Sequence, residues 1–75
     1  MGTLAIMDPN AGDLKVMWDS HNKAEVKAAK EQFDSLRRKG HLAYKVSGEG
    51  KKGVQIHEFD AKAEKIIMAP ALRGG

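Results

Sequence analysis

The stretch Leu72-Arg73-Gly74-Gly75 is the first candidate for chemistry, because its two glycines either simply end a folded domain or are themselves the part that reacts. Gly74 and Gly75 lack a β-carbon, so a backbone that ends in them can extend through a narrow channel and approach reacting groups closely. The same residues also fit a frayed tail without a role, because chain ends are commonly disordered. The elements before the tail must decide between these interpretations.

A cluster of cations is the second candidate for function. It would bind nucleic-acid phosphates, with Trp18 or Tyr44 stacking on a base. The alternative interpretation is structural, because cations at a helix C-terminus offset the macrodipole and both aromatic residues fall in phase with core positions. Five residues form this candidate nucleic-acid contact: Arg37, Arg38, Lys39, Lys51 and Lys52.

Other possible sites are weaker. His21, His41 and His57 have no metal-ligand spacing, so we interpret them as surface histidines next to turns and expect no metal site. The glycine-rich stretch 48–53 lacks a complete phosphate-loop pattern and is interpreted as a hairpin loop. The carboxylates are interpreted as solvated charges, since nothing places two of them in an apolar pocket. They are Asp34, Glu58 and Asp60.

Length and composition limit the function classes. A chain of 75 residues with 41% hydrophobic content has room for one small domain, and an enclosed substrate pocket would consume much of its core. We therefore expect no enzyme and no cofactor. The absence of cysteine excludes disulfides and thiolate chemistry, and the net charge of +3 is a mild excess. The sequence shows no signal peptide and no apolar run long enough to span a bilayer, so we expect a cytoplasmic protein without membrane contact.

The hydrophobic pattern predicts a hairpin first. Alternating apolar residues over residues 3–18, interrupted by turn residues, predict two strands joined by a loop of four or five residues. Four apolar residues share one face of this hairpin and are the first predicted core positions. They are Leu4, Ile6, Val16 and Trp18.

A helix of about four turns follows the hairpin. Asn22 and Glu25 have the spacing of a capping box, and Gly40 can adopt the left-handed conformation that ends a helix. Apolar residues then recur at intervals of three and four and predict one buried stripe. The stripe consists of Val26, Ala29, Phe33 and Leu36.

Alternation returns after Gly40. One face of the next strand would carry Leu42, Tyr44 and Val46, and the strand after it would present Val54 and Ile56. The apolar run near residues 64–69 predicts a last strand that is covered on both faces and therefore central, beside the first strand. A proline then ends its pairing. One helix on one mixed sheet gives a two-layer α+β domain over residues 1–70, followed by a flexible tail over 71–75.

The order of elements, the length and the terminal Leu72-Arg73-Gly74-Gly75 resemble the ubiquitin-like modifiers of the β-grasp fold. The four terminal residues match the end of ubiquitin letter for letter, and the remaining resemblance is architectural. It implies that the chain is a monomeric substrate whose Gly75 carboxylate is activated by an E1-like enzyme and joined to lysines of target proteins, with an E2-like enzyme or a deconjugating protease as further partners. Gly74 and Gly75 would then form the conjugation site, and Leu72 and Arg73 would be the residues by which partners recognise the tail, with Arg73 offering a fork of hydrogen-bond donors to an acidic partner. The alternative function within this resemblance is that of a sulfur carrier, in which the terminal carboxylate is converted to a thiocarboxylate. The third-strand region offers no clear equivalent of ubiquitin's apolar surface patch, so binding by ubiquitin readers is not expected.

Overall fold

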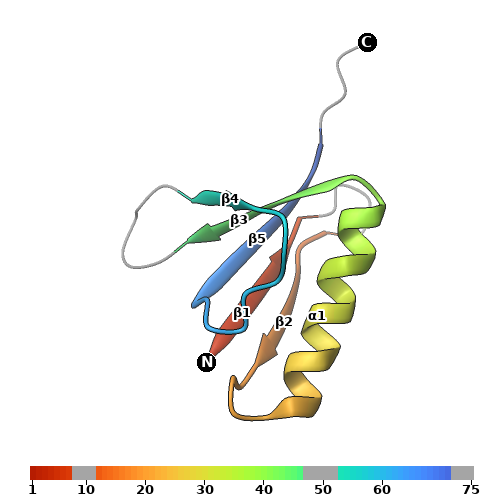
Figure 1. Cartoon of the computed structure of the whole chain (residues 1–75). Helices are drawn as coiled ribbons and strands as arrows, with labels where there is room; N and C mark the ends of the chain where they lie inside the picture. Colours follow the sequence, from red (N-terminus) through yellow and green to blue (C-terminus); the bar gives the residue numbers. More distant parts are fainter. Residues whose placement is uncertain (8–11, 47–52, 72–75) are drawn as a thin grey trace.

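The sheet of this protein contains five strands in the order β2-β1-β5-β3-β4, and helix α1 packs on one of its faces (Figure 1). The structure, a computed structural model, describes residues 1–7, 12–46 and 53–71. This is the α+β arrangement that the sequence predicts, with one helix on a mixed sheet. The elements along the chain are β1 (Gly2–Ile6), β2 (Leu14–Trp18), α1 (Lys23–Arg38), β3 (His41–Val46), β4 (Val54–Ile56) and β5 (Lys65–Pro70).

Strand β5 lies in the centre of the sheet, as predicted. It pairs in parallel with β1 and antiparallel with β3, and it ends at Pro70. The two-sided cover predicted for it is wrong for the described residues, because α1 covers only one face of the sheet (Figure 1). Strands β1 and β2 form the predicted antiparallel hairpin, but residues 7–13 separate them, so the connection is longer than the predicted four or five residues.

Local hydrogen bonds explain where α1 begins and ends. The Oδ1 atom of Asn22 accepts from the backbone N–H groups of Ala24 and Glu25 at 3.1 and 3.2 Å, which satisfies two of the free donors of the first turn. In a capping box the Glu25 side chain would accept from the backbone N–H of Asn22. Here Glu25 Oε1 accepts from the backbone N–H of Asp19 at 2.8 Å instead. The N–H of Asn22 instead donates to the Asp19 carbonyl. At the other end Gly40 has φ +96°, the left-handed conformation expected after a helix.

The core lies between α1 and the helix-facing side of the sheet. The predicted core residues Leu4, Ile6 and Trp18 occupy it, together with Ile66 and Met68 of β5. Ala29, Phe33 and Leu36 meet them from α1. Val16 and Val26 are only partly buried at its margin. Because these contacts join residues far apart in sequence, the core holds both ends of the described chain together. The largest fully buried side chains are Trp18, Phe33, Leu4, Ile66 and Met68.

Strand β3 has the opposite phase to the predicted one. Ala43 is fully buried and pairs with the buried Met68, so the odd-numbered residues of β3 face α1. The predicted core residues Leu42, Tyr44 and Val46 therefore lie on the open face of the sheet, and all three are half-buried. Ile56, the cross-strand partner of Ala43 on β4, also packs against the core.

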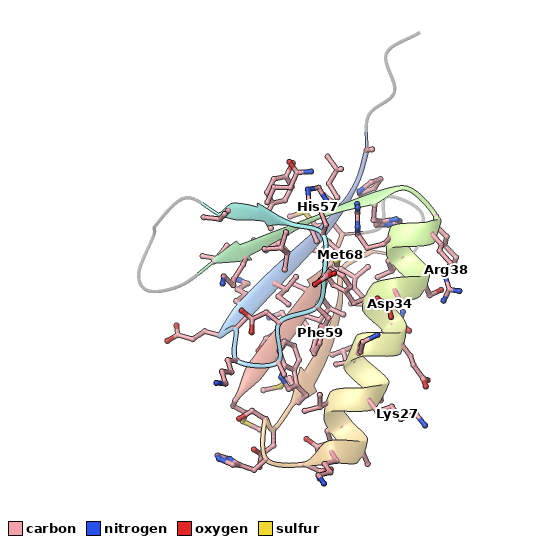
Figure 2. The ribbon with its side chains drawn as sticks, viewed as in Figure 1. Lys27, Asp34, Arg38, His57, Phe59 and Met68 are labelled. Carbon is pink, nitrogen blue, oxygen red and sulfur yellow. The ribbon has the colours of Figure 1, made fainter. Side chains whose placement is uncertain are left out.

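Strand β4 is short, and the core is completed by the connection after it. Val54 is 63% exposed, contrary to the prediction that it faces the core, whereas Ile56 packs against the core. Phe59 lies in the connection over residues 57–64 (Figure 2). Its ring lies 4.9 Å from that of Trp18 and 5.8 Å from that of Phe33. The indole Nε1 of Trp18 also donates to the Ala61 carbonyl at 2.9 Å. These contacts hold the connection against the core.

Asp60 fixes the turn within this connection. Its Oδ1 accepts from the backbone N–H of Lys62 at 2.9 Å, and its Oδ2 accepts from Lys45 Nζ at 3.1 Å. The backbone hydrogen bond from Lys62, followed by the bond from Lys45, lowers the pKa of this carboxyl below its ordinary 3.8, and desolvation opposes the shift.

We expect Asp60→Ala to lower the free energy of unfolding by about 1 kcal/mol at neutral pH, because both bonds are lost and the side chain is partly solvated. The depressed folded pKa means that the carboxylate's contribution is present above 3.8 and is lost as the pH falls through the folded value. Asp60→Asn keeps an acceptor for Lys62 and should be milder and less pH-dependent. Urea unfolding at neutral and acidic pH measures this, and an Asp60→Ala protein with unchanged stability at neutral pH would contradict it.

Candidate functional site

The candidate tail leaves the sheet at the end of β5. Pro70 is the last residue of this strand and lies opposite His41, the first residue of β3 (Figure 1). Ala71 is the last described residue. The predicted conjugation residues Gly74 and Gly75 and the predicted recognition residues Leu72 and Arg73 lie outside the described residues.

A group of cationic and imidazole side chains lies beside the root of this tail. Arg37, in the last turn of α1, donates from Nη1 to the His41 carbonyl at 2.8 Å, and its Nη2 contacts His57 Nδ1 at 3.3 Å. A guanidinium group can only donate, so this contact requires His57 Nδ1 to be the unprotonated acceptor. We call this group the cationic corner; its members are Arg37, Arg38, Lys39, His41 and His57.

The two outer cations of the cationic corner face solvent. Arg38 and Lys39 are exposed, and neither side chain makes an ion pair or hydrogen bond within the described part of the chain. Arg38 projects from the side of α1 away from the sheet (Figure 2). Both residues lie at the C-terminal end of the helix, where the macrodipole favours positive charge. The corner therefore presents two freely accessible cations beside one that is held in place.

The neighbouring acid on α1 does not neutralise this corner. Asp34 Oδ2 accepts from Lys30 Nζ at 2.8 Å, one turn nearer the start of the helix. The hydrogen bond to Asp34 raises the pKa of the Lys30 ammonium above its ordinary value. Asp34 is thus engaged away from the corner, in agreement with the prediction that it is a surface charge rather than part of an acid-base pair.

The structure does not assemble the predicted nucleic-acid set in one place. Trp18 is fully buried, so its ring cannot stack on a base. Tyr44 lies on the open face of the sheet, opposite the face that α1 covers. Lys51 and Lys52 lie outside the described residues. Of the predicted cations, only Arg37, Arg38 and Lys39 are brought together in the described part of the molecule.

The three histidines separate into two locations. His41 and His57 meet around Arg37, whereas His21 lies just before the start of α1 with its backbone N–H bonded to Asp19 Oδ1. Residues 1–7, 12–46 and 53–71 contain no group of three side chains that could hold a metal ion. In the same ranges no helix is long and apolar enough to cross a membrane.

The structure brings together two features that the sequence did not predict. The contact between Arg37 and His57 joins the end of α1 to the connection after β4, and no local pattern signals a contact across twenty positions. The second feature is apolar: Leu42, Tyr44 and Ile67 lie half-buried on the open face, with Tyr44 directly opposite Ile67. These residues form an apolar surface on the open face of the sheet, and the expectation that ubiquitin readers do not bind this chain stays a prediction.

Comparison with family models, curated proteins and solved structures finds no match for the chain. The functional argument rests on the residues and their geometry.

Proposed function

We propose that this chain is a ubiquitin-like protein modifier with a β-grasp fold. Its Gly75 carboxylate is activated by a separate E1-like enzyme and is then joined to lysine side chains of target proteins. The observation that carries the proposal is that β5, held on both sides in the centre of the sheet, leads within two residues into Leu72-Arg73-Gly74-Gly75.

The arrangement of the sheet supports the β-grasp assignment. Its first and last strands pair in parallel at the centre, its first two strands form a hairpin, and one helix packs on a single face. The sequence predicts this place beside the first strand from the apolar run of the last strand. The tail therefore starts from a strand that is paired on both sides, which suits a protein whose end enters another protein's active site.

The chemistry assigned to Gly75 needs an activating step, because a carboxylate is a poor electrophile. A carboxylate oxygen attacks the α-phosphorus of ATP and pyrophosphate leaves, which gives an acyl-adenylate. An enzyme thiolate then displaces AMP to form a thioester. Finally a target lysine amine displaces the thiolate, loses a proton and forms an isopeptide bond. This chain supplies the carboxylate and a tail whose two glycines carry no side chain at the reacting end.

The test uses the arginine that precedes the two glycines. Trypsin cuts after Arg73, so each lysine joined to Gly75 should keep a Gly-Gly remnant that mass spectrometry detects. We expect a set of remnant peptides in the host that vanishes in a strain lacking the protein and returns when the gene is restored. Intact mass of the purified protein should also show that Gly75 carries the free carboxylate.

Two results would contradict conjugation. Remnant peptides that are identical in both strains belong to another modifier. An intact mass in which one oxygen is replaced by sulfur, without any remnants that depend on this protein, would identify a sulfur carrier.

A further inference from the structure

We propose that the cationic corner is the surface by which this chain docks on the enzyme that activates Gly75, through acidic side chains of that enzyme. The inference rests on the proposed function and adds the surface and the partner chemistry. Three observations support it: the place of the corner, the absence of an ion pair to Arg38 and Lys39 among residues 1–7, 12–46 and 53–71, and the fixed position of Arg37.

The corner lies next to the root of the tail. His41 is paired opposite Pro70, and the guanidinium of Arg37 donates to the carbonyl of the same His41. Residues 71–75, even when fully extended, span at most about 17 Å. An enzyme that holds the carboxylate of Gly75 must therefore place part of its surface within that distance of the end of β5. The cationic corner is a charged surface that such an enzyme meets there.

The positive charge of the corner indicates that the partner's surface is acidic. Arg38 and Lys39 are exposed without an ion pair among the described residues, and Asp34 is already bound to Lys30. Cations in this setting attract Asp and Glu side chains, and complementary charge raises the rate of encounter. Acidic groups around the entrance of the enzyme's channel would attract these cations, and because the corner lies beside the root of the tail, this attraction would bring the tail to the entrance.

Arg37 adds orientation to this attraction. The contacts with His41 and His57 hold its guanidinium in one position, which reduces the conformational entropy lost on binding. Each contact uses one hydrogen of Nη1 or Nη2, so each of these nitrogens keeps a second hydrogen. A carboxylate of the enzyme can accept from this pair of nitrogens, so Arg37 fixes the orientation while Arg38 and Lys39 contribute attraction.

The test reverses charge at the corner and, as a matched control, at the other end of the same helix. The corner variant is Arg38→Glu with Lys39→Glu, and the control is Lys23→Glu with Lys27→Glu; all four side chains are exposed. We expect the level of Gly-Gly conjugates in host cells to fall at least about tenfold in the corner variant and to change less than about twofold in the control. Because glutamates at a helix C-terminus disfavour the helix, Arg38→Gln with Lys39→Gln serves as a second variant, with a smaller loss and an unchanged melting temperature.

Each outcome decides the inference. Equal conjugate levels in the folded corner and control variants would overturn it while leaving the proposed function intact. Absence of conjugates with the unaltered chain would remove the proposed function and this inference together. Binding of a single-stranded oligonucleotide that both corner variants lose, while their conjugates persist, would assign the corner to nucleic acid instead.

Discussion

Deletion of Gly74 and Gly75 is expected to abolish conjugation and to leave the melting temperature of the domain unchanged. Without these residues the chain ends in the carboxylate of Arg73, whose bulky side chain would stand where the tail is expected to pass through a narrow channel. The fold should persist because β5 ends at Pro70 and the buried core residues lie between Leu4 and Met68. Conjugates are measured by remnant mass spectrometry, and stability by circular dichroism during heating.

The matched control replaces Gly75 by Ala, which keeps the chain length and the terminal carboxylate but adds a methyl group. We expect fewer conjugates with this variant and none with the deletion. A truncated chain that melts at a clearly lower temperature would mean that the tail is structural, and one that still forms conjugates would exclude Gly75 as the reacting residue.

Phe33→Ala is expected to cost about 3–5 kcal/mol of the free energy of unfolding. The ring of Phe33 is fully buried and makes a T-shaped contact with the ring of Phe59, which in turn packs against Trp18. Its loss therefore leaves a cavity between α1, the sheet and the 57–64 connection. Domains of this kind have total stabilities of about 5–15 kcal/mol, so the variant should be only marginally folded.

Urea unfolding followed by the fluorescence of the single tryptophan, Trp18, measures this change. Lys27→Ala is the matched control, because Lys27 is exposed on the same helix (Figure 2) and its replacement should change stability by less than about 0.5 kcal/mol. A loss of less than about 1 kcal/mol for Phe33→Ala would show that the site collapses around the smaller residue and that the ring contacts contribute little.

Much of the fold could be predicted because its elements have clear periods. The apolar residues of α1 recur at intervals of three and four, and those of β1 alternate with residues on the other face. The apolar run of β5 predicts a central strand. Strand β3 was assigned the wrong phase because apolar residues occur on both of its faces: Leu42 and Tyr44 outweigh the small Ala43 in the pattern, yet Ala43 is the buried one. Phe59 and Ala63 were not predicted as core residues because the connection that holds them has no period.

The site was predictable only in part. The residue types of the tail predict a conjugation site there, and the cluster of charge at the helix end predicts a binding role for Arg37, Arg38 and Lys39. The contact of Arg37 with His57 depends on how the connection after β4 crosses the end of α1, which is a property of tertiary packing. A sequence read locally contains no signal for such a contact.

The central place of β5 also has a consequence for the synthesis of the protein. A ribosome makes the chain from its N-terminus, so β1 and β3 are complete long before the strand that must lie between them. Until Lys65–Pro70 has emerged, the sheet is divided into two hairpins with no shared centre, and small hairpins are marginal on their own. Folding therefore waits for nearly the entire chain. A chain whose synthesis stops before β5 would lack the central strand of its sheet as well as its tail. Such a chain would stay unfolded and would be open to proteolysis.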